Sequence, residues 1–201
     1  TMATGIIDYG MCNLQSVQNS LSFIVDKSFI SSDVKQLAEA EKIILPGVGA
    51  FKDAIELLRD KGLDQFLEQI KEENKPLLGI CLGMQLLFDS STEFGEHKGL
   101  GLIPGEVVKF QLEGMKIPHM GWNALNITKE APLFKNLPDE PQVYFVHSYH
   151  LKTKADVVSA TTNYGYDVQV AAQEGQVYGL QFHPEKSGDV GLQILRNFAA
   201  L

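Results

Sequence analysis

The chain has few of the features that cross-link a protein or anchor it in a membrane. Among its 201 residues there are two cysteines, Cys12 and Cys81, and one tryptophan. The first residues do not join a basic segment to a long apolar stretch, so we expect no signal peptide and two reduced thiols in a cytoplasmic protein. No apolar run reaches the roughly 18 residues that a membrane span needs, so no membrane partner is expected.

Positive charge is also scarce. Lysine and arginine number 17 against 25 aspartates and glutamates, and the net charge is −8. A nucleic-acid binder needs a basic face, so this balance argues against nucleic acid as a partner. We find no repeat, no low-complexity segment and no linker, and the length suits a single domain over residues 1–201.

The first half of the chain alternates short apolar runs with segments of helical periodicity. In order, these predicted strands and helices are 3–8, 14–24, 42–49, 50–74 with a break at Gly62, 76–80 and 82–91. This alternation is typical of βαβ units. The second half holds closely spaced strand candidates before a helix at 190–200. The sequence therefore predicts an α/β fold, with a mixed, mainly parallel central sheet, flanking helices and extra antiparallel strands.

Cys81 stands between Gly79 and Gly83, where a predicted strand gives way to a predicted helix. This is the nucleophile-elbow pattern, in which glycines prevent collisions around a sharply turned nucleophile. The helix N-terminus favours a thiolate, and the N–H group of Leu82 is expected to be available to an oxyanion. A lone cysteine is more often a buried hydrophobe, and Cys12, which lacks this setting, is interpreted so.

A cysteine nucleophile needs a base that is oriented by a third group. His183 follows the apolar run "VYGLQF", and Glu185 comes two residues later in "HPE". Side chains two apart in an extended segment point the same way, so the carboxylate can hold the imidazole. The motif alone is weak, because a surface histidine near an unrelated glutamate would look the same. Together with Cys81 it predicts a Cys81–His183–Glu185 triad.

Glycines after a third predicted strand offer further oxyanion donors. The segment "LPGVGAF" (45–51) places Gly47 and Gly49 before a helix, where backbone N–H groups can turn toward an anion. An ordinary strand-to-helix turn is the alternative. Nothing in the sequence predicts a metal or a cofactor: "GLGLIPG" (99–105) has Pro104 where a dinucleotide fingerprint needs glycine, and no Cys/His spacing resembles a zinc site.

Together, "GICLGMQ" and the distant "FHPE" resemble the class I glutamine amidotransferases, whose fold is flavodoxin-like. Within that class the resemblance is greatest to the family of glutaminase subunits of imidazole glycerol phosphate synthase. Six blocks carry it, namely "IIDYGMCNLQSV", "LPGVGAF", "GICLGMQLLF", "IPHMGWN", "YFVHSY" and "GLQFHPEKSG". The first block departs from the family pattern, because Cys12 replaces a glycine.

The resemblance implies a glutaminase that works through a Cys81 thioester. His183 would move the proton and Glu185 would orient it, while the N–H groups of Gly49 and Leu82 would hold the oxyanion. The glutamine-binding residues that the resemblance implies are Gly47, Gly49, Gln85, His147, Ser148 and Tyr149.

The resemblance also implies a heterodimer with a (β/α)8 cyclase subunit. Ammonia would reach this partner through a channel and enter imidazole glycerol phosphate and aminoimidazole carboxamide ribotide, in histidine biosynthesis. His119, Met120 and Trp122 would form the docking patch on an exposed loop, with Tyr144 at its rim, because aromatic anchors dominate interfaces.

Three alternatives remain at this point. One is a glutaminase that serves anthranilate, guanylate or carbamoyl phosphate synthesis, which segments 45–51 and 117–123 fit less well. Another is a cysteine peptidase or other thiol protein on a similar sheet. The third is an inactive scaffold, against which the intact Cys81–His183–Glu185 set argues.

Overall fold

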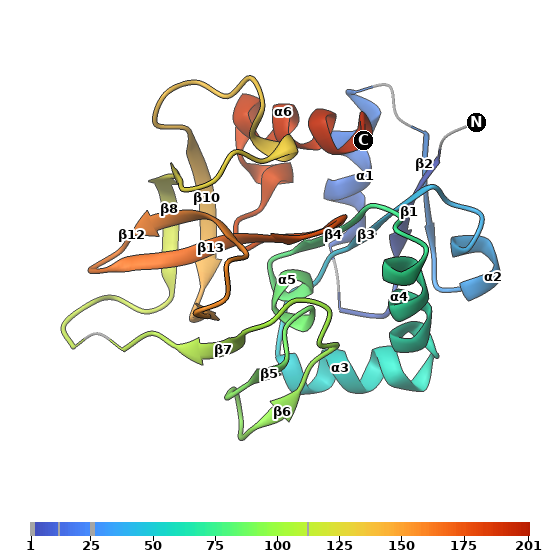
Figure 1. The fold of residues 1–201 in the computed structure, drawn as a ribbon, viewed down its shortest axis with the longest axis horizontal. Helices are drawn as coiled ribbons and strands as arrows, with labels where there is room; N and C mark the ends of the chain where they lie inside the picture. The colour runs from blue at the N-terminus through green and yellow to red at the C-terminus, as the bar shows by residue number, and fades with distance from the viewer. Residues whose placement is uncertain (1–2, 12, 25–26, 112) are drawn as a thin grey trace.

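In the computed structural model, which describes residues 3–11, 13–24, 27–111 and 113–201, a long mixed sheet crosses the molecule (Figure 1). Five strands at one end of the sheet run parallel to one another. In spatial order they are β2 (Lys27–Ser31), β1 (Ala3–Ile7), β3 (Lys42–Leu45), β4 (Leu77–Ile80) and β14 (Val177–Leu180). Apart from the numbering of the last strand, this is the flavodoxin-like order. It confirms the predicted α/β fold class.

Helices cover both faces of the parallel strands. On one face α1 (Leu14–Ser22) and α6 (Gly188–Ala199) share a core with Ile44, while α3 (Phe51–Asp60) and α4 (Leu63–Glu72) share the opposite core with Ile43. Successive strand residues point to opposite faces, so strands covered on both sides are apolar throughout. The short helix α2 (Val34–Leu37) follows β2. No helix within the described ranges is both long and apolar enough to cross a membrane.

The predicted break at Gly62 is confirmed, whereas one predicted helix differs from the observed one. The segment 50–74 forms α3 and α4, separated by Gly62 in a left-handed conformation with φ of 70°. The predicted helix 82–91 is wrong in length, because α5 (Leu82–Leu86) ends after five residues. The N–H groups of Leu100 and Leu102 donate to the carbonyls of Leu86 and Leu87, both at 2.8 Å, and thereby occupy acceptors that a longer helix would use.

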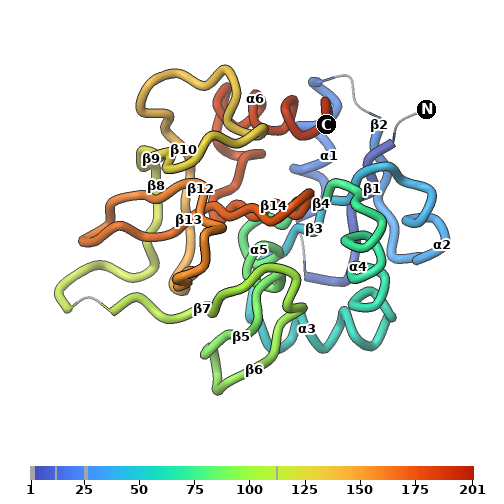
Figure 2. The backbone as a smooth tube through the Cα atoms, in the orientation of Figure 1, coloured from blue at the N-terminus to red at the C-terminus, as the bar shows by residue number. Residues whose placement is uncertain are grey.

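The second half of the chain extends the sheet in mainly antiparallel fashion, as predicted. From β14 the order continues through β13 (Asp167–Glu174), β11 (Tyr149–Lys152), β7 (Glu106–Lys109), β5 (Ser90–Ser91) and β6 (His97–Lys98). Strand β12 (Val158–Asn163) pairs with β13 and with β9 (Asn126–Ile127), and two short 3-10 turns are η1 (Pro132–Phe134) and η2 (Pro184–Lys186). Figure 2 shows how the chain returns along this extension to lay β14 beside β4.

A separate two-stranded ribbon contains the sequence that was predicted to be an exposed loop. Strand β8 (His119–Ala124) pairs antiparallel with β10 (Gln142–His147) along six residues. The loop prediction is wrong, because glycine and asparagine in β8 do not prevent a full backbone ladder with β10. Strand alternation then sends neighbouring side chains to opposite faces, and this separates residues that the sequence had grouped.

Candidate active site

Cys81 occupies the sharp turn between β4 and α5. Its backbone has φ of 56° and ψ of −113°, a conformation that side chains rarely adopt and that costs of order 1–3 kcal/mol. A Cβ atom on Gly83 would lie 1.8 Å from the Leu45 carbonyl oxygen, and one on Gly79 would lie 2.7 Å from the Gly83 carbonyl oxygen. Glycine is therefore required on both sides, as the nucleophile-elbow interpretation predicts.

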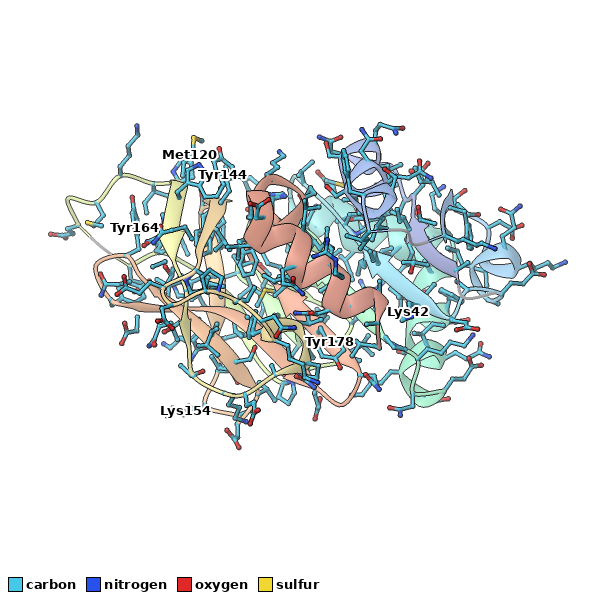
Figure 3. The ribbon with its side chains drawn as sticks, turned by 90° about the horizontal axis from the view of Figure 1, so that it is seen from above. Lys42, Met120, Tyr144, Lys154, Tyr164 and Tyr178 are labelled. Carbon is cyan, nitrogen blue, oxygen red and sulfur yellow. The ribbon has the colours of Figure 1, made fainter. Side chains whose placement is uncertain are left out.

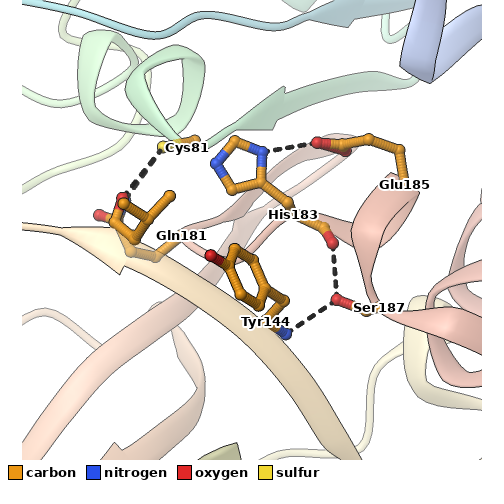
Figure 4. A network of polar contacts seen from close by, with 7 residues as sticks. Cys81, Tyr144, Gln181, His183, Glu185 and Ser187 are labelled. Carbon is orange, nitrogen blue, oxygen red and sulfur yellow. Dashed lines mark hydrogen bonds and ion pairs between the residues drawn. The ribbon is translucent and has the colours of Figure 1, made fainter. Parts of the chain in front are cut away.

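His183 and Glu185 reach the same place from the neighbouring strand. Leu180 of β14 pairs in register with Ile80 of β4, so the residues that follow β14 pass beside Cys81. His183 Nδ1 donates a hydrogen bond to Glu185 Oε1 at 2.5 Å, and both side chains are buried. The imidazole ring lies between the sulfur and the carboxylate (Figure 4). Among the described residues, His183 Nε2 and Glu185 Oε2 have no hydrogen-bond partner.

The charge state of His183 follows from these neighbours. Burial lowers the pKa of the imidazole, but the negative charges at Cys81 and Glu185 and the hydrogen bond to Glu185 raise it more, to about 10 from an ordinary 6.5. The ring therefore carries a proton at neutral pH. An imidazolium held between a carboxylate and a sulfur is suited to stabilising a thiolate and to donating a proton to a leaving group.

Cys81 and His183 open into a cavity of about 340 Å³. The other lining residues are Val48, Gly49, Leu82, Gln85, Glu93, Pro118, Val146, His147, Ser148 and Tyr149. This volume lies at the lower end of the range for small-molecule sites. All the predicted glutamine-binding residues line it except Gly47. A Cβ on Gly47 would meet the Tyr9 hydroxyl oxygen at 2.1 Å, so this glycine instead permits close packing behind the cavity wall.

The predicted oxyanion donors are not both available. The N–H group of Leu82 donates to the Gly47 carbonyl oxygen at 3.2 Å, which contradicts the expectation that it is available. A helix N-terminus leaves its first N–H groups without intrahelical partners, and the 45–51 segment supplies a carbonyl to this one. Gly49 has φ of 113°, which favours glycine, and the Val48 N–H group donates to the Met11 carbonyl oxygen at 2.8 Å.

His147 belongs to a buried chain of hydrogen bonds. Its Nδ1 lies 2.9 Å from the Tyr149 carbonyl oxygen, which can only accept, so Nδ1 is the donor. His147 Nε2 then accepts from His119 Nδ1 at 3.0 Å, and His119 Nε2 accepts from the Asn123 amide at 3.4 Å. Burial lowers the pKa of His147 to about 3, although the Tyr149 hydrogen bond opposes this, and burial lowers the pKa of His119 to about 4. Both rings are neutral at pH 7, which this arrangement of donors requires.

Strand β8 places the residues of the predicted docking patch on two different faces. His119 is buried with its ring stacked on Phe145 and is not part of an exposed patch, because its position in β8 faces inward. Met120 and Trp122, which alternate with it, are 60% and 57% exposed. Tyr144 pairs in register with Trp122, and their ring centroids are 6.0 Å apart. Figure 3 shows Met120 and Tyr144 close together at the end of the ribbon.

Five residues at the site were not predicted, namely Val48, Glu93, Pro118, Val146 and Gln181. Glu93 lines the cavity and accepts a hydrogen bond from the Phe51 N–H group at 2.8 Å. Gln181 lies 3.8 Å from the Cys81 sulfur, and Val146 contributes to the wall. Glu93 lies in no motif. Gln181 lies inside "GLQFHPEKSG", but only the parallel pairing of "LLGI" with "VYGL" places it beside Cys81.

No metal was predicted from the sequence, and the second cysteine was interpreted as a buried hydrophobe. Within the described part of the chain, no three His, Cys, Asp or Glu side chains are grouped so as to hold a metal ion. Cys12 lies outside the described residues. His150 forms hydrogen bonds with the Leu151 carbonyl and the Tyr166 hydroxyl.

Comparison with known proteins places this site in a family. Residues 6–200 match the family described as "Glutamine amidotransferase class-I", and the chain belongs to that family. It is 52% identical over 202 residues to "Imidazole glycerol phosphate synthase subunit HisH" of Shouchella clausii (strain KSM-K16), covering 98% of this chain and 97% of that protein. The protein of the same name in Sulfurimonas denitrificans (strain ATCC 33889 / DSM 1251) is 52% identical over 198 residues, with 96% and 95% covered.

Solved structures support the fold alone. "Structure of PurLQS from Thermotoga maritima" has a TM-score of 0.78 at 18% identity and covers 98% of this chain and 97% of that one. "Crystal structure of glutamine amidotransferase" has a TM-score of 0.78 at 19% identity, with 98% and 99% covered.

Proposed function

We propose that this chain is the glutaminase subunit of an imidazole glycerol phosphate synthase. The observation that carries the proposal is the convergence of Cys81, His183 and Glu185 at one cavity, in a chain half identical over its length to HisH subunits. The family match over residues 6–200 supports the companion proposal that residues 1–201 form one glutamine amidotransferase domain.

The first half-reaction forms a thioester. The Cys81 thiolate attacks the side-chain carbonyl carbon of glutamine, and the carbonyl oxygen becomes an oxyanion. The His183 imidazolium then gives its Nε2 proton to the departing nitrogen, the C–N bond breaks, and ammonia leaves. Glu185 keeps the ring oriented through its hydrogen bond to Nδ1.

The second half-reaction regenerates the enzyme. Neutral His183 takes a proton from a water molecule, whose oxygen attacks the thioester carbonyl. The C–S bond breaks, glutamate leaves, and the Cys81 thiolate again faces a protonated imidazole. Each proton removed in one half-reaction is returned in the other, so no cofactor or metal is needed.

Oxyanion stabilisation requires a local change. The Leu82 N–H group must leave the Gly47 carbonyl oxygen, and the N–H group of Gly49, which lines the cavity, would be the second donor. The positive φ of Gly49 and the long 3.2 Å hydrogen bond of Leu82 support a movement of segment 47–49. A donor aimed at an oxyanion is worth about 3–4 kcal/mol in the transition state, so this movement would control the rate.

The cavity lining suits the amino-acid end of glutamine. The Gln85 amide nitrogen is already bonded to Tyr149 and Gln181, which leaves its oxygen to accept from the substrate ammonium group. The Glu93 carboxylate adds negative charge for the same group, and the Ser148–Tyr149 backbone lies across the cavity.

A cyclase partner would use the ammonia. We assign docking of a (β/α)8 cyclase subunit to the exposed face of the β8–β10 ribbon, formed by Met120, Trp122 and Tyr144, because that face continues to Val146 at the cavity wall. Ammonia would cross between the subunits, out of contact with bulk water, in a cytoplasmic heterodimer. The partner would then form imidazole glycerol phosphate and aminoimidazole carboxamide ribotide.

The decisive experiment measures glutamine hydrolysis by the purified chain with and without a cyclase barrel and its nucleotide ligand. We expect weak activity alone, a large increase with the liganded partner, and complete loss in Cys81→Ser. Activity that a cyclase barrel leaves unchanged, but that an anthranilate, guanylate or carbamoyl phosphate synthetase subunit increases, would show that the partner assignment is wrong.

A further inference from the structure

Gln181 is a fully buried polar residue that lies directly beside the nucleophile. It follows the last residue of β14, its exposed fraction is 0%, and its backbone N–H group donates to the Val170 carbonyl oxygen at 2.9 Å. The register of β14 with β4 carries it alongside Cys81 (Figure 4). Since a buried side-chain amide needs hydrogen-bond partners, its neighbours show what it does.

The direction of the hydrogen bonds is fixed from the Tyr149 carbonyl oxygen, which can only accept. The Gln85 amide must therefore turn its nitrogen toward Tyr149, at 3.2 Å. The same nitrogen donates its second hydrogen to Gln181 Oε1 at 3.0 Å. Gln181 Nε2 is thus turned toward Cys81 Sγ at 3.8 Å. Reversing either amide would place two acceptors, or two donors, against each other.

The other groups around the sulfur make this donor important. The Val146 carbonyl oxygen lies 3.9 Å from Cys81 Sγ, where it can accept from a thiol but repels a thiolate. The titratable side chains around the same cavity are His183, which Glu185 supports from behind, and His147, Glu93 and Tyr149. Of these only His183 is cationic at neutral pH, so an N–H donor from Gln181 offsets the adjacent carbonyl.

We propose that Gln181 is a positioning residue for the nucleophile: its amide donates to the Cys81 sulfur, stabilises the thiolate and holds the side chain in place at the elbow. Gln85 acts in turn on Gln181 and so links the cavity lining to the sulfur. The catalytic consequence rests on the proposed glutaminase function, whereas the contact itself does not.

The test measures the rate at which iodoacetamide alkylates Cys81 as a function of pH, with peptide mass mapping to separate Cys81 from Cys12. Gln181→Met keeps the size of the side chain but removes the donor. We expect the midpoint of its pH–rate profile to lie about one unit higher, and alkylation below the midpoint to be about tenfold slower, because a hydrogen bond to a charged group is lost. Gln181→Glu places a carboxylate at the sulfur and is expected to move the midpoint further.

The matched control is Gln169→Met. Gln169 also makes two hydrogen bonds, both with the Thr153 backbone, but it lies outside the cavity. It should leave the midpoint unchanged, and thermal unfolding shows which variants remain folded. Unshifted midpoints in the folded Gln181 variants, or an equal shift in Gln169→Met, would overturn the proposal.

Turnover separates this inference from the proposed function. In the complex with a liganded cyclase barrel, the acid limb of the kcat/KM profile for glutamine should move with the alkylation midpoint in Gln181→Met. If the wild-type complex does not hydrolyse glutamine, the proposed function fails while the alkylation profiles still decide the role of Gln181.

Discussion

At the scale of single residues, two glycines create the geometry of the nucleophile. Gly83 allows α5 to start against the end of β3, where a Cβ would lie 1.8 Å from the Leu45 carbonyl oxygen. Backbone atoms on both sides of this contact leave no flexible side chain to move. The sequence pattern around Cys81 was therefore informative because it recorded a steric requirement of the backbone.

We predict that Gly83→Ala unfolds at least several degrees below the wild type and loses glutaminase activity, because overpacking against backbone costs about 1–3 kcal/mol or more. Differential scanning calorimetry measures the unfolding temperature. Gly175→Ala is the control for a substitution without a collision: nothing lies within 4 Å of the added Cβ, and its φ is positive, at 58°, unlike that of Gly83. An equal loss in both variants would mean that the collision with the Leu45 carbonyl does not explain the effect of Gly83→Ala.

The His183–Glu185 pair makes a pH-dependent contribution to stability. The pKa of His183 rises to about 10 in the folded chain, so folding favours the protonated ring. This stabilisation is complete below the unfolded value near 6.5 and is lost as the pH rises through about 10. We predict that urea unfolding at pH 6, 8 and 10 shows a steeper decline for the wild type than for Glu185→Gln. Parallel curves would show that the carboxylate does not hold the proton.

At the scale of elements, the stability that the β8–β10 ribbon contributes depends on pH in the opposite direction. The pKa values of His147 and His119 are lowered to about 3 and 4 in the folded chain. Below pH 6.5 these two rings therefore bind protons in the unfolded chain but stay neutral in the folded one. Stability contributed by the neutral rings is therefore lost as the pH falls from 6.5 toward 3. We predict that His147→Gln shows a shallower loss of unfolding free energy over this window, whereas His97→Gln, with a half-buried ring on β6 outside the ribbon, matches the wild type.

Helix α6 is attached to the sheet through a buried lysine. Lys42 of β3 is 3% exposed, and its Nζ donates to the Ala199 carbonyl oxygen at 2.8 Å, at the end of α6. Lys42→Met should lower the free energy of unfolding by about 1–3 kcal/mol, because the charged hydrogen bond is lost. Lys27→Met on the exposed part of β2 is the comparison, and urea titration measures both. Equal effects of the two substitutions would show that the hydrogen bond from Lys42 to Ala199 does not stabilise the fold.

Prediction at this scale succeeded where periodicity and burial agreed. The helices of 50–74 and 190–200 have one apolar face, and the parallel strands are apolar throughout, so local pattern and tertiary position coincide. It failed at 82–91 and 117–123, where distant backbone decides the outcome. Carbonyls after α5 are taken by the 99–103 segment, and β8 exists because β10 pairs with it. Neither partner is visible locally.

At the scale of the whole molecule, we have proposed that the exposed ribbon face docks the partner. We predict that Trp122→Ala weakens binding to the cyclase barrel about 30-fold, the effect of removing an interface anchor worth about 2 kcal/mol, and leaves Cys81 alkylation unchanged. Isothermal titration measures the affinity. Phe23→Ala, with a side chain 74% exposed at the end of α1, is the matched aromatic control. Unchanged affinity in Trp122→Ala would show that the partner docks on another face of the chain.

The sequence was sufficient to predict those residues of the site that lie in recognisable motifs. Cys81, His183 and Glu185 sit in patterns that combine a backbone constraint with a chemical one. Glu93 could not be found, and Gln181 was missed because its place beside Cys81 follows only from the pairing of β14 with β4. The state of the Leu82 N–H group was also inaccessible, since it depends on a hydrogen bond across two loops.

The hydrogen bonds that run from Asn123 through His119 and His147 end on the same Tyr149 oxygen that fixes Gln85. A partner that docks on the ribbon and moves this chain of hydrogen bonds would therefore also move the Gln85 amide that lines the cavity. If docking changes the affinity for glutamine by some factor, glutamine must change the affinity for the partner by the same factor. A substrate-loaded subunit would then be retained in the assembly more, or less, firmly than an empty one, by that same factor in affinity.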